Sequence, residues 1–474
     1  MRPVPWHIMK TASAARPAGA GSGHWRAGHS NCHSPVLLHA DAMKTTSLHP
    51  ADSIDLEMLP APAGHCRFCA APLHVTFVDL GTSPLCQDHV PPEQFNHAEA
   101  FYPLHAYVCE ECYLVQVGEF VAPANVFRQD YAYFSSYSPS WLRHAEAYCE
   151  LVTERFGLTE NSLVVEVASN DGYLLQYLVA KGIPVLGVEP ARNVADAAVL
   201  KGVPSLRKFF GSATAREIVE SHGLADLLIG NNVLAHVPDL NDFVRGLRLA
   251  LKPSGVVTME FPHLQQLIAG NQFDTIYHEH FSYLSFWTVE RIFAHHGLTI
   301  FDVQKLPTHG GSLRIYARHR DATSAPLAVT TAVWELRIYE LATGVCELGF
   351  YADFAEQARE AKRKLLEFLI AAKRAGKTVV GYGAPGKGNT LLNYCGIRTD
   401  FIDYTVDLNP HKQGNFLPGT RIPILEPHHI LETRPDYLLI LPWNLREEIM
   451  TQMAAIREWG GQFVVPIPEV KVYA

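Results

Sequence analysis

Two pairs of cysteines have the residue type and the spacing of a metal site. Cys66 and Cys69 form one CxxC pair, and Cys109 and Cys112 form the other. Two such knuckles supply four thiolates, the ligand set of a structural zinc ion that has no open position for catalysis. Redox-active thiols are the alternative, but neither pair has the strand–helix context of a thioredoxin-like motif. We therefore predict one structural Zn²⁺ per chain, with Cys86, between the pairs, as the alternative fourth ligand.

A turn of small residues between a predicted strand and a predicted helix is the second candidate site. The segment EVASNDG runs from Glu166 to Gly172, and Rossmann-type sheets bind their cofactors at such a turn, where the following helix begins. The carboxylate of Glu166 suits the positively charged methionine part of S-adenosylmethionine better than it suits a phosphate. The next strand ends in Glu189, which can accept hydrogen bonds from both hydroxyls of a ribose.

The spacing of these carboxylates is compatible with NAD as well as with S-adenosylmethionine. However, Ala168 and Asn170 stand where a GxGxG loop has glycine, and a pyrophosphate needs the close backbone approach that glycine allows. We therefore predict S-adenosylmethionine. Further along, Asn231 and Asn232 in GNNVLAHVPD either bind this cofactor or cap the next helix. The predicted cofactor-binding residues are Glu166, Ala168, Ser169, Asn170, Gly172, Glu189, Asn231 and Asn232.

A cluster of titratable side chains at Tyr277-His278-Glu279-His280 could carry out acid–base chemistry. Removal of a proton beside a carbonyl gives an enolate whose carbon can attack a methyl sulfonium, and histidine is the usual base for such a step near neutral pH. If this segment is helical, Tyr277 and His280 share one face, and Tyr277 could donate a hydrogen bond to the enolate oxygen. Glu279 could orient a histidine or contact the substrate. We expect His278 to be an ordinary polar residue.

Two glycine-rich turns are candidates for contact with a substrate. His309-Gly-Gly-Ser-Leu-Arg314 enters a predicted strand, and its glycines indicate either close approach to a ligand or simply a sharp turn. GYGAPGKG nearly matches a Walker A loop, but Gly388 replaces the Mg²⁺-binding Ser or Thr, so an ATPase is not expected. The loop can still hold a pyrophosphate beside Lys387, or be only a strand–helix turn. The predicted substrate-binding residues are His309, Gly310, Gly311, Ser312, Gly383, Lys387 and Asn389.

The elements that position these motifs follow the pattern of a doubly wound α/β fold. Apolar strands alternate with helix patterns across residues 151–320, which predicts a largely parallel sheet. A long helical stretch follows at residues 332–375, and residues 376–474 repeat the strand–loop–helix order on a smaller scale. The strand candidates of the first sheet are Leu163–Val167, Val185–Val188, Leu227–Ile229 and Gly255–Glu260.

Composition excludes several other classes of protein. The net charge of −9 argues against a nucleic-acid-binding protein, which needs an excess of Lys and Arg. No apolar run approaches the ~20 residues of a membrane helix. Nine cysteines, four of them in CxxC pairs, favour metal ligation in a reducing cytoplasm over a disulfide framework. Residues 1–60 are rich in Ala, Gly, Ser, Pro and His without periodicity, so we expect a disordered extension, with Met43 and Met58 as alternative starts.

Four long motifs in the same order make this chain similar to a known family. EVASNDGYLL, GNNVLAHVPDL, FDTIYHEHFSYLS and PTHGGSLR, together with the CxxC pairs, resemble the zinc-binding sugar C-methyltransferases. Those enzymes use S-adenosylmethionine to methylate C3, or sometimes C5, of dTDP-linked 4-keto-6-deoxysugars. The resemblance covers about residue 62 to the end, and GYGAPGKGNTLLN and LPGTRIPI resemble the family's third domain. The N-terminal extension departs from the family pattern.

The resemblance implies an active site and a domain order. It implies that Tyr277, Glu279 and His280 are catalytic, with His280 as the base that deprotonates the carbon beside the ketone. Together with the composition, this leads us to expect a cytoplasmic class I methyltransferase that binds a nucleotide-sugar and neither nucleic acid nor a membrane, and a monomer is the working expectation. The expected parts are a disordered extension (1–60), a zinc-binding domain (61–125), a linker helix (126–150) that becomes helical after Ser140, a methyltransferase domain (151–320), a helical connector (321–375) and a C-terminal Rossmann-like nucleotide-sugar-binding domain (376–474).

Three other functions remain open from the sequence. An O- or N-methyltransferase for small molecules would share the cofactor loop without needing an acid–base cluster. A zinc-containing RNA methyltransferase would bind RNA with a steep salt dependence. An NAD-dependent sugar epimerase or reductase would use the C-terminal glycine loop and bind NAD in place of S-adenosylhomocysteine.

Overall fold

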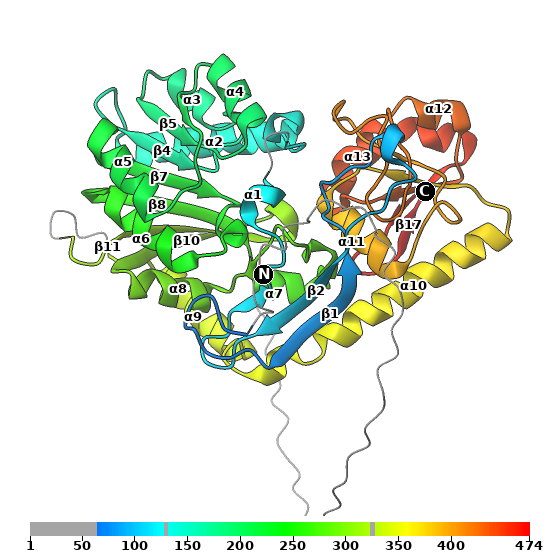
Figure 1. Ribbon diagram of the computed structural model, residues 1–474, viewed down its shortest axis with the longest axis horizontal. Coiled ribbons are helices and arrows are strands. Elements are labelled where there is room, and N and C mark those ends of the chain that lie inside the picture. Colours follow the sequence, from blue (N-terminus) through cyan, green and yellow to red (C-terminus); the bar gives the residue numbers. More distant parts are fainter. Residues whose placement is uncertain (1–63, 128–130, 323–327) are drawn as a thin grey trace, which may run out of the picture. The chain divides into compact units, whose positions relative to one another are not determined.

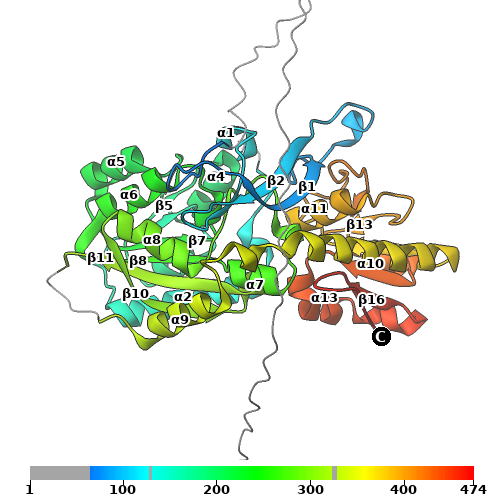
Figure 2. The same cartoon turned by 90° about the horizontal axis from the view of Figure 1, so that it is seen from below.

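The computed structural model describes residues 64–127, 131–322 and 328–474, which belong to one compact unit. The extension expected at residues 1–60 lies outside this range. Within the described part of the chain, no helix combines the length and apolar character needed to cross a bilayer. Figures 1 and 2 show the elements coloured along the chain.

The N-terminal part is built on a four-stranded antiparallel sheet in the order β1-β2-β3-β9. Its first three strands are β1 (Val75–Ser83), β2 (Tyr102–Val108) and β3 (Val115–Val117), followed by the short helix α1 (Pro123–Val126). The fourth strand, β9 (Ser282–Tyr283), comes from far along the chain and directly follows the Tyr277–His280 segment. This sheet therefore joins the cysteine pairs to the predicted acid–base cluster.

The central sheet has seven strands in the order β10-β11-β8-β7-β4-β5-β6. Strands β4 to β8 pair in parallel, and β11 runs antiparallel between β8 and β10. The doubly wound α/β prediction is confirmed, and the predicted strands occur within a few residues of their expected bounds. The strands are β4 (Val164–Val167), β5 (Val185–Val188), β6 (Ser205–Leu206), β7 (Ala225–Asn231), β8 (Leu251–Pro262), β10 (Leu298–Leu306) and β11 (Ser312–His319).

Seven helices accompany this sheet among the described residues, and the first of them starts close to its predicted position. The linker helix at 126–150, expected to become helical after Ser140, is α2 (Pro139–Phe156), which ends beyond the expected boundary. Ser138 caps its start by accepting a hydrogen bond from the Trp141 amide, with proline at the first helical position, and Gly157 ends it in a left-handed conformation. The others are α3 (Leu175–Val179), α4 (Arg192–Leu200), α5 (Ser212–His222), α6 (Leu240–Ala250), α7 (Leu264–Ala269) and α8 (Phe286–His295).

The C-terminal part begins with two helices rather than one long helical stretch. Helices α9 (Thr331–Thr343) and α10 (Phe354–Arg374) are separated because Gly344 has a φ of +89°. A six-stranded sheet follows in the order β14-β13-β12-β15-β16-β17, parallel except for β17. Its elements are β12 (Val379–Tyr382), α11 (Gly386–Cys395), β13 (Thr405–Val406), β14 (Ile424–Leu425), α12 (His429–Thr433), β15 (Tyr437–Ile440), α13 (Arg446–Gln452), β16 (Gln462–Val465) and β17 (Lys471–Tyr473).

Two large hydrophobic clusters connect the N-terminal sheet to the rest of the chain. On one side, Phe77 of β1 stacks on Phe354 of α10, with 4.4 Å between ring centroids, in a cluster that extends through the C-terminal sheet. On the other side, Cys109 and Cys112 share a cluster with Phe286 of α8. The cysteine knuckles are therefore packed against the central sheet and do not form a separate module.

Candidate active site and zinc centre

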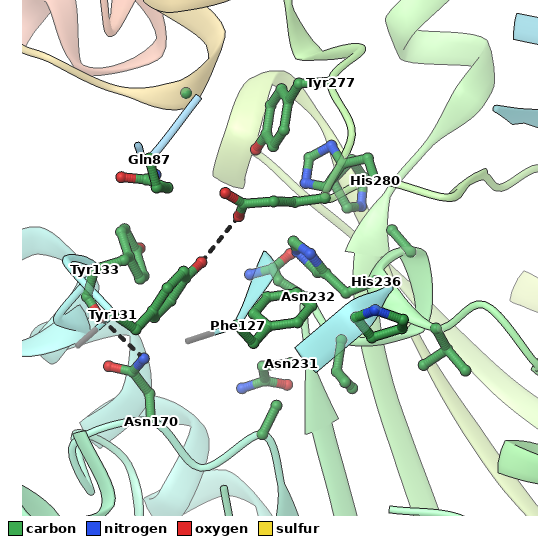
Figure 3. A pocket seen from close by; sticks show the side chains of 18 of the residues that line it. Gln87, Phe127, Tyr131, Tyr133, Asn170, Asn231, Asn232, His236, Tyr277 and His280 are labelled. Carbon is green, nitrogen blue, oxygen red and sulfur yellow. Dashed lines mark hydrogen bonds between the residues drawn. The ribbon is translucent and has the colours of Figure 1, made fainter. Parts of the chain in front are cut away.

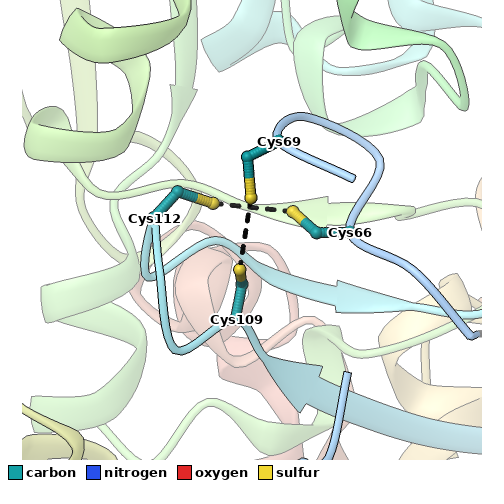
Figure 4. Close-up of side chains that lie close together, drawn as sticks. All are labelled: Cys66, Cys69, Cys109 and Cys112. Atoms are coloured by element: carbon teal, nitrogen blue, oxygen red, sulfur yellow. Dashed lines mark hydrogen bonds between the residues drawn. The ribbon is translucent and has the colours of Figure 1, made fainter. Parts of the chain in front are cut away.

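The four cysteines of the predicted zinc site come together (Figure 4). The Sγ atoms of Cys66 and Cys112 are 3.5 Å apart, as are those of Cys69 and Cys109, and all four lie within 4.8 Å of one another. Zinc–thiolate bonds of about 2.3 Å in a tetrahedron place the sulfur atoms about 3.8 Å apart, so the geometry fits a zinc ion. Cys86 lies elsewhere and contacts Glu279, so the alternative ligand set is wrong.

The backbone and a neighbouring glutamine support this ligand geometry. Each knuckle closes through a left-handed residue after its second cysteine, with φ of +61° at Ala70 and +60° at Tyr113. The side-chain amide of Gln116 donates to Cys66 Sγ at 3.2 Å and accepts from the Arg67 backbone amide at 2.9 Å. Such donors to thiolate sulfur orient the ligands of a metal and stabilise their charge.

A cavity of about 690 Å³ lies at the carboxyl ends of β4, β5 and β7 (Figure 3). Its walls also include the Tyr277–His280 turn and residues of the loop that precedes α11. Ligands of open α/β sheets bind at this edge. The cavity is large enough for a cofactor and a second small molecule.

The half of the cavity at the ends of β5 and β7, the predicted cofactor half, contains buried polar groups without a hydrogen-bond partner among the described residues. Asn231 and Asn232 line it, and the side-chain Nδ2 and Oδ1 of Asn231 have no hydrogen-bond partner among the described residues. Glu189 also lines the cavity and accepts hydrogen bonds from the backbone amides of Asn170 at 3.1 Å and Ala191 at 2.9 Å. Burial raises the pKa of Glu189 to about 7. Orphaned amides beside a carboxylate at a strand end fit the ribose and adenine of S-adenosylmethionine.

Three of the predicted cofactor residues lie behind the loop and do not line the cavity. Glu166 is fully buried in β4, where burial raises the pKa of its carboxyl well above the ordinary value. The hydroxyl of Ser169 fills the space over Gly187, where a Cβ would come within 2.4 Å of it. Gly172 has a φ of +74° and lies against Ala198. These residues shape the turn, whereas the predicted residues that line the cavity are Ala168, Asn170, Glu189, Asn231 and Asn232.

Asn170 has a role that its sequence motif did not indicate. Its side-chain Oδ1 accepts from the Ser135 amide at 2.8 Å, and its Nδ2 donates to the Tyr133 carbonyl at 3.2 Å. The side chain therefore fastens the aromatic segment before α2 to the cofactor loop. The backbone amide of Asn170 donates to Glu189, which also lines the cavity.

The Tyr277–His280 segment is a turn rather than the helix considered from the sequence. The His280 amide donates to the Tyr277 carbonyl at 2.9 Å, and the two rings still lie together, with centroids 4.0 Å apart. His280 Nδ1 is 2.8 Å from the Thr275 carbonyl. A carbonyl can only accept, so Nδ1 carries the proton and Nε2 keeps a free lone pair. Burial lowers the pKa of His280 well below its usual value, which keeps the ring in this basic form.

The neighbours of His280 in the turn divide between the cavity and the N-terminal sheet. Glu279 lines the cavity and accepts hydrogen bonds from the Tyr131 hydroxyl at 2.9 Å and the Cys86 thiol at 3.3 Å. Burial raises the pKa of Glu279. His278 points away from the cavity, with Nε2 3.1 Å from the Pro103 carbonyl of β2.

Sequence reasoning missed three residues of this cavity. His236 lies beside His280, with ring centroids 4.6 Å apart, and burial lowers the pKa of His236 to about 4. Tyr131 contacts Glu279, and Lys412 is buried in the wall and donates to the Ala384 carbonyl at 2.9 Å. His236 is inside the GNNVLAHVPD motif, which was a usable signal, but no motif marks Lys412.

Of the seven predicted substrate-binding residues, His309 and Lys387 line the cavity. Lys387 donates to Asn444 Oδ1 at 2.8 Å, and its ammonium lies 4.5 Å from the centroid of the Trp443 ring. Burial lowers the pKa of Lys387 to about 8, against a partly opposing effect of nearby Asp274. The predicted residues that lie outside the cavity wall are Gly310, Gly311, Ser312, Gly383 and Asn389.

The glycines of both turns are needed for packing within the protein. At Gly310, with a φ of +88°, a Cβ would lie 2.7 Å from Gln272 Nε2 and from the Trp443 ring. At Gly383, with a φ of +89°, it would lie 2.6 Å from Pro442. These two glycines therefore allow close packing within the protein, and the turns place His309 and Lys387 in the cavity wall.

Comparisons with known proteins agree with this arrangement. Family models match residues 66–127, described as "Putative zinc binding domain", residues 141–303, described as "Methyltransferase domain", and residues 307–468, described as "C-methyltransferase C-terminal domain". The C-methyltransferase NovU of Streptomyces niveus is 37% identical over 411 residues, which cover 87% of this chain and 97% of that protein.

Similar solved structures cover only part of the chain. Magnesium protoporphyrin IX methyltransferase (ChlM) from Synechocystis PCC 6803 with bound SAM is 14% identical with a TM-score of 0.29, over 37% of this chain and 78% of that one. The PH0226 protein from Pyrococcus horikoshii OT3 is 18% identical with a TM-score of 0.32, over 40% and 95%. TM-scores this low support no conclusion about function, so the family assignment rests on the family models and the Streptomyces relative.

Proposed function

The chain belongs to the family of zinc-binding, S-adenosylmethionine-dependent C-methyltransferases, and from this we propose that its substrate is a nucleotide-linked 4-keto-deoxysugar of the dTDP type. It is a class I methyltransferase with a structural zinc site. The family assignment and the four-cysteine cluster confirm the predicted cofactors, S-adenosylmethionine and zinc. The substrate and the catalytic roles below are our proposal.

The observation that carries the proposal is the tautomer of His280. Its Nδ1–H is held by the Thr275 carbonyl, and the ring lines the same cavity as Glu189 and Asn231 of the cofactor half. A neutral histidine with a free Nε2 is a competent general base. An O- or N-methyltransferase has less need of such a buried base, because its acceptor atom already has a lone pair.

The proposed reaction starts with removal of a proton from the carbon beside the ketone by His280 Nε2. The electron pair of that C–H bond forms an enolate, and Tyr277 would donate a hydrogen bond to its oxygen. When bound, S-adenosylmethionine supplies an electrophilic methyl group on its sulfonium. The enolate carbon would take this methyl group, the C–S electron pair would stay on the sulfur of S-adenosylhomocysteine, and His280 would later release its proton to water.

The rest of the cavity would hold the two ligands in place. Glu189 is placed to accept the ribose hydroxyls of the cofactor, and the orphaned amide of Asn231 to bind the same molecule. Lys387 and His309 line the wall on the substrate side, where a lysine could bind the diphosphate. Glu279, held by Tyr131 and Cys86, would contact the sugar.

Mass spectrometry of the protein with S-adenosylmethionine and a panel of nucleotide-linked 4-keto-deoxysugars tests the proposal. We expect one methyl group on carbon beside the ketone. His280→Gln should lower kcat by about 10²- to 10⁴-fold, the usual contribution of a general base, and leave cofactor binding intact. Tyr277→Phe should have a smaller effect. His319→Gln is the matched control, because His319 Nε2 lies 3.1 Å from the Leu251 carbonyl, outside the cavity.

Two results would contradict the proposal. Methyl transfer to oxygen or nitrogen would exclude the enolate route. Undiminished turnover by the His280→Gln enzyme would show that another residue removes the proton, and His309, which also lines the cavity, would then be tested.

A further inference from the structure

The catalytic turn is attached to the zinc-binding part of the chain on both sides. Before His280, His278 Nε2 is bonded to the Pro103 carbonyl of β2 at 3.1 Å. After His280, the Phe281 carbonyl accepts from the Val117 amide at 3.1 Å, and β9 pairs with β3. The position of the His280 ring therefore depends on the position of the zinc-bearing sheet.

Arg67 makes this attachment more direct, because it lies inside a zinc knuckle between Cys66 and Cys69. Its Nη1 donates to the Pro238 carbonyl at 3.0 Å and its Nη2 donates to the Val117 carbonyl at 2.5 Å. The guanidinium carbon also lies 5.3 Å from the centroid of the Phe281 ring. One side chain thus reaches the methyltransferase loop, the strand β3 and the residue that follows His280.

The groups that Arg67 touches belong to the two segments that carry the cavity histidines. Pro238 is two residues after His236, and Phe281 directly follows His280. The Phe281 amide donates to the Ala235 carbonyl at 2.7 Å, which joins the two segments to each other. The rings of His236 and His280 then meet at 4.6 Å between centroids.

The knuckle is held from the opposite direction as well. Asn241, at the start of α6, donates through Nδ2 to the Phe68 carbonyl at 2.9 Å and to the Arg67 carbonyl at 3.3 Å. Asn241 Oδ1 is in turn 2.8 Å from His296 Nε2. The backbone of the knuckle is thus fixed by zinc ligation on one side and by α6 on the other, so the Arg67 side chain starts from a rigid base.

We propose that Arg67 is a positioning residue that transmits the zinc-fixed geometry of the Cys66–Cys69 knuckle to His236 and His280. The inference rests on the proposed role of His280 as the general base, with His236 beside it. The planar guanidinium can satisfy two carbonyls at fixed angles, which a lysine ammonium cannot reproduce. Zinc therefore contributes to catalysis through alignment, in addition to its contribution to folding, because displacement of a base by about 1 Å can cost about 10²-fold in rate.

Arg67→Met and Arg67→Lys test this role, with Arg291→Met as the matched control. Arg291 donates through Nη1 to the Glu111 carbonyl in the other knuckle and does not touch the histidine segments. For Arg67→Met we expect about one zinc per chain, S-adenosylhomocysteine affinity within about twofold of the wild type, and kcat lower by roughly 10- to 100-fold. The kcat of Arg67→Lys should lie between those of the wild type and Arg67→Met, and the kcat of Arg291→Met should match the wild type.

Nitrogen NMR of the histidine rings supplies a measurement that does not depend on turnover. The wild type should show His280 as the Nδ1–H tautomer, because of the bond to Thr275, and Arg67→Met should show a mixture of tautomers. A purely structural role would lower the melting temperature and leave the tautomer and kcat at low temperature unchanged, and that result would overturn the proposal. If Arg67→Met does not fold, the same measurements on Arg67→Lys decide.

The two proposals can fail separately. If His280→Gln retains activity but Arg67→Met still alters the His280 tautomer, the positioning inference stands and the base assignment fails. If His280→Gln is inactive and the Arg67 variants keep the wild-type tautomer and kcat, the base assignment stands and the positioning inference fails.

Discussion

Replacement of Lys387 by Met should weaken binding of the nucleotide-sugar and spare binding of the cofactor. The ammonium lies in the cavity wall, held by Asn444 and by the face of Trp443. A hydrogen bond from a charged donor contributes about 1.5–3 kcal/mol, which corresponds to an increase of about 10- to 150-fold in KM for the sugar. Lys362→Met is the matched control, because Lys362 also makes a carbonyl and a ring contact, with Tyr394, outside the cavity.

The pH dependence of KM for the nucleotide-sugar is a second test of the role of Lys387. Burial lowers the pKa of Lys387 to about 8, so in the free enzyme the ammonium loses its charge as the pH rises through 8. An anionic diphosphate binds the charged form, so KM for the sugar should rise above pH 8, by up to about tenfold per pH unit. Steady-state kinetics between about pH 6.5 and about pH 9.5, a range that spans the pKa of Lys387, measure this change in KM.

Two results would refute the reasoning about Lys387. The first is a KM for the sugar that Lys387→Met leaves unchanged while the pH profile stays the same as in the wild type. The second is an equal loss of S-adenosylhomocysteine affinity, measured by calorimetry, which would show that the lysine acts on the whole cavity. In either case the diphosphate would have to be bound by other residues, and buried Lys412 would be examined next.

Three further outcomes are expected. Cys66→Ser should lose zinc and much of its thermal stability, because zinc ligation contributes free energy of folding; metal analysis and a melting curve measure both, and retained zinc would contradict the ligand assignment. Cofactor affinity should fall below pH 7, where Glu189, with a pKa of about 7, loses the negative charge that favours hydrogen bonds from the ribose hydroxyls. Calorimetry at about pH 6 and about pH 8 should show this fall in the wild type and not in Glu189→Gln, as expected for one titrating group. Gly310→Ala should be destabilised by about 1–3 kcal/mol, from its φ of +88° and the clash with Gln272 and Trp443; a denaturation curve that matches the wild type would contradict the packing argument.

The fold was predictable where the local sequence carries a complete signal. Apolar runs ending in polar residues placed four of the five parallel strands of the central sheet, all except β6. Parallel strands end at one edge, so Glu189, Asn231 and Asn232 were expected to meet a common ligand. The start of α2 was predicted to within about two residues, where Ser138 and Pro139 form a recognisable cap.

The predictions that failed concern segments whose conformation depends on contacts between residues far apart in the sequence. The Tyr277–His280 segment forms a turn because His278 makes a hydrogen bond with the Pro103 carbonyl and because β9, which follows, pairs with β3. The local sequence pattern indicates neither contact. Tyr131 enters the cavity because Asn193 binds both its amide, at 3.2 Å, and its carbonyl, at 2.9 Å. Such side-chain clamps follow from the tertiary fold and cannot be read from spacing.

The pairing of β3 with β9 also constrains the order in which the chain can fold during synthesis. Val115 pairs with Tyr283, so the ribosome must add well over a hundred further residues before this edge of the sheet is covered, which takes roughly ten to thirty seconds. All four zinc ligands emerge before that point, so the nascent chain can hold its metal while one strand edge stays open. Open edges pair with other chains. A fragment that ends before β9 should therefore aggregate through β3 even when it binds zinc.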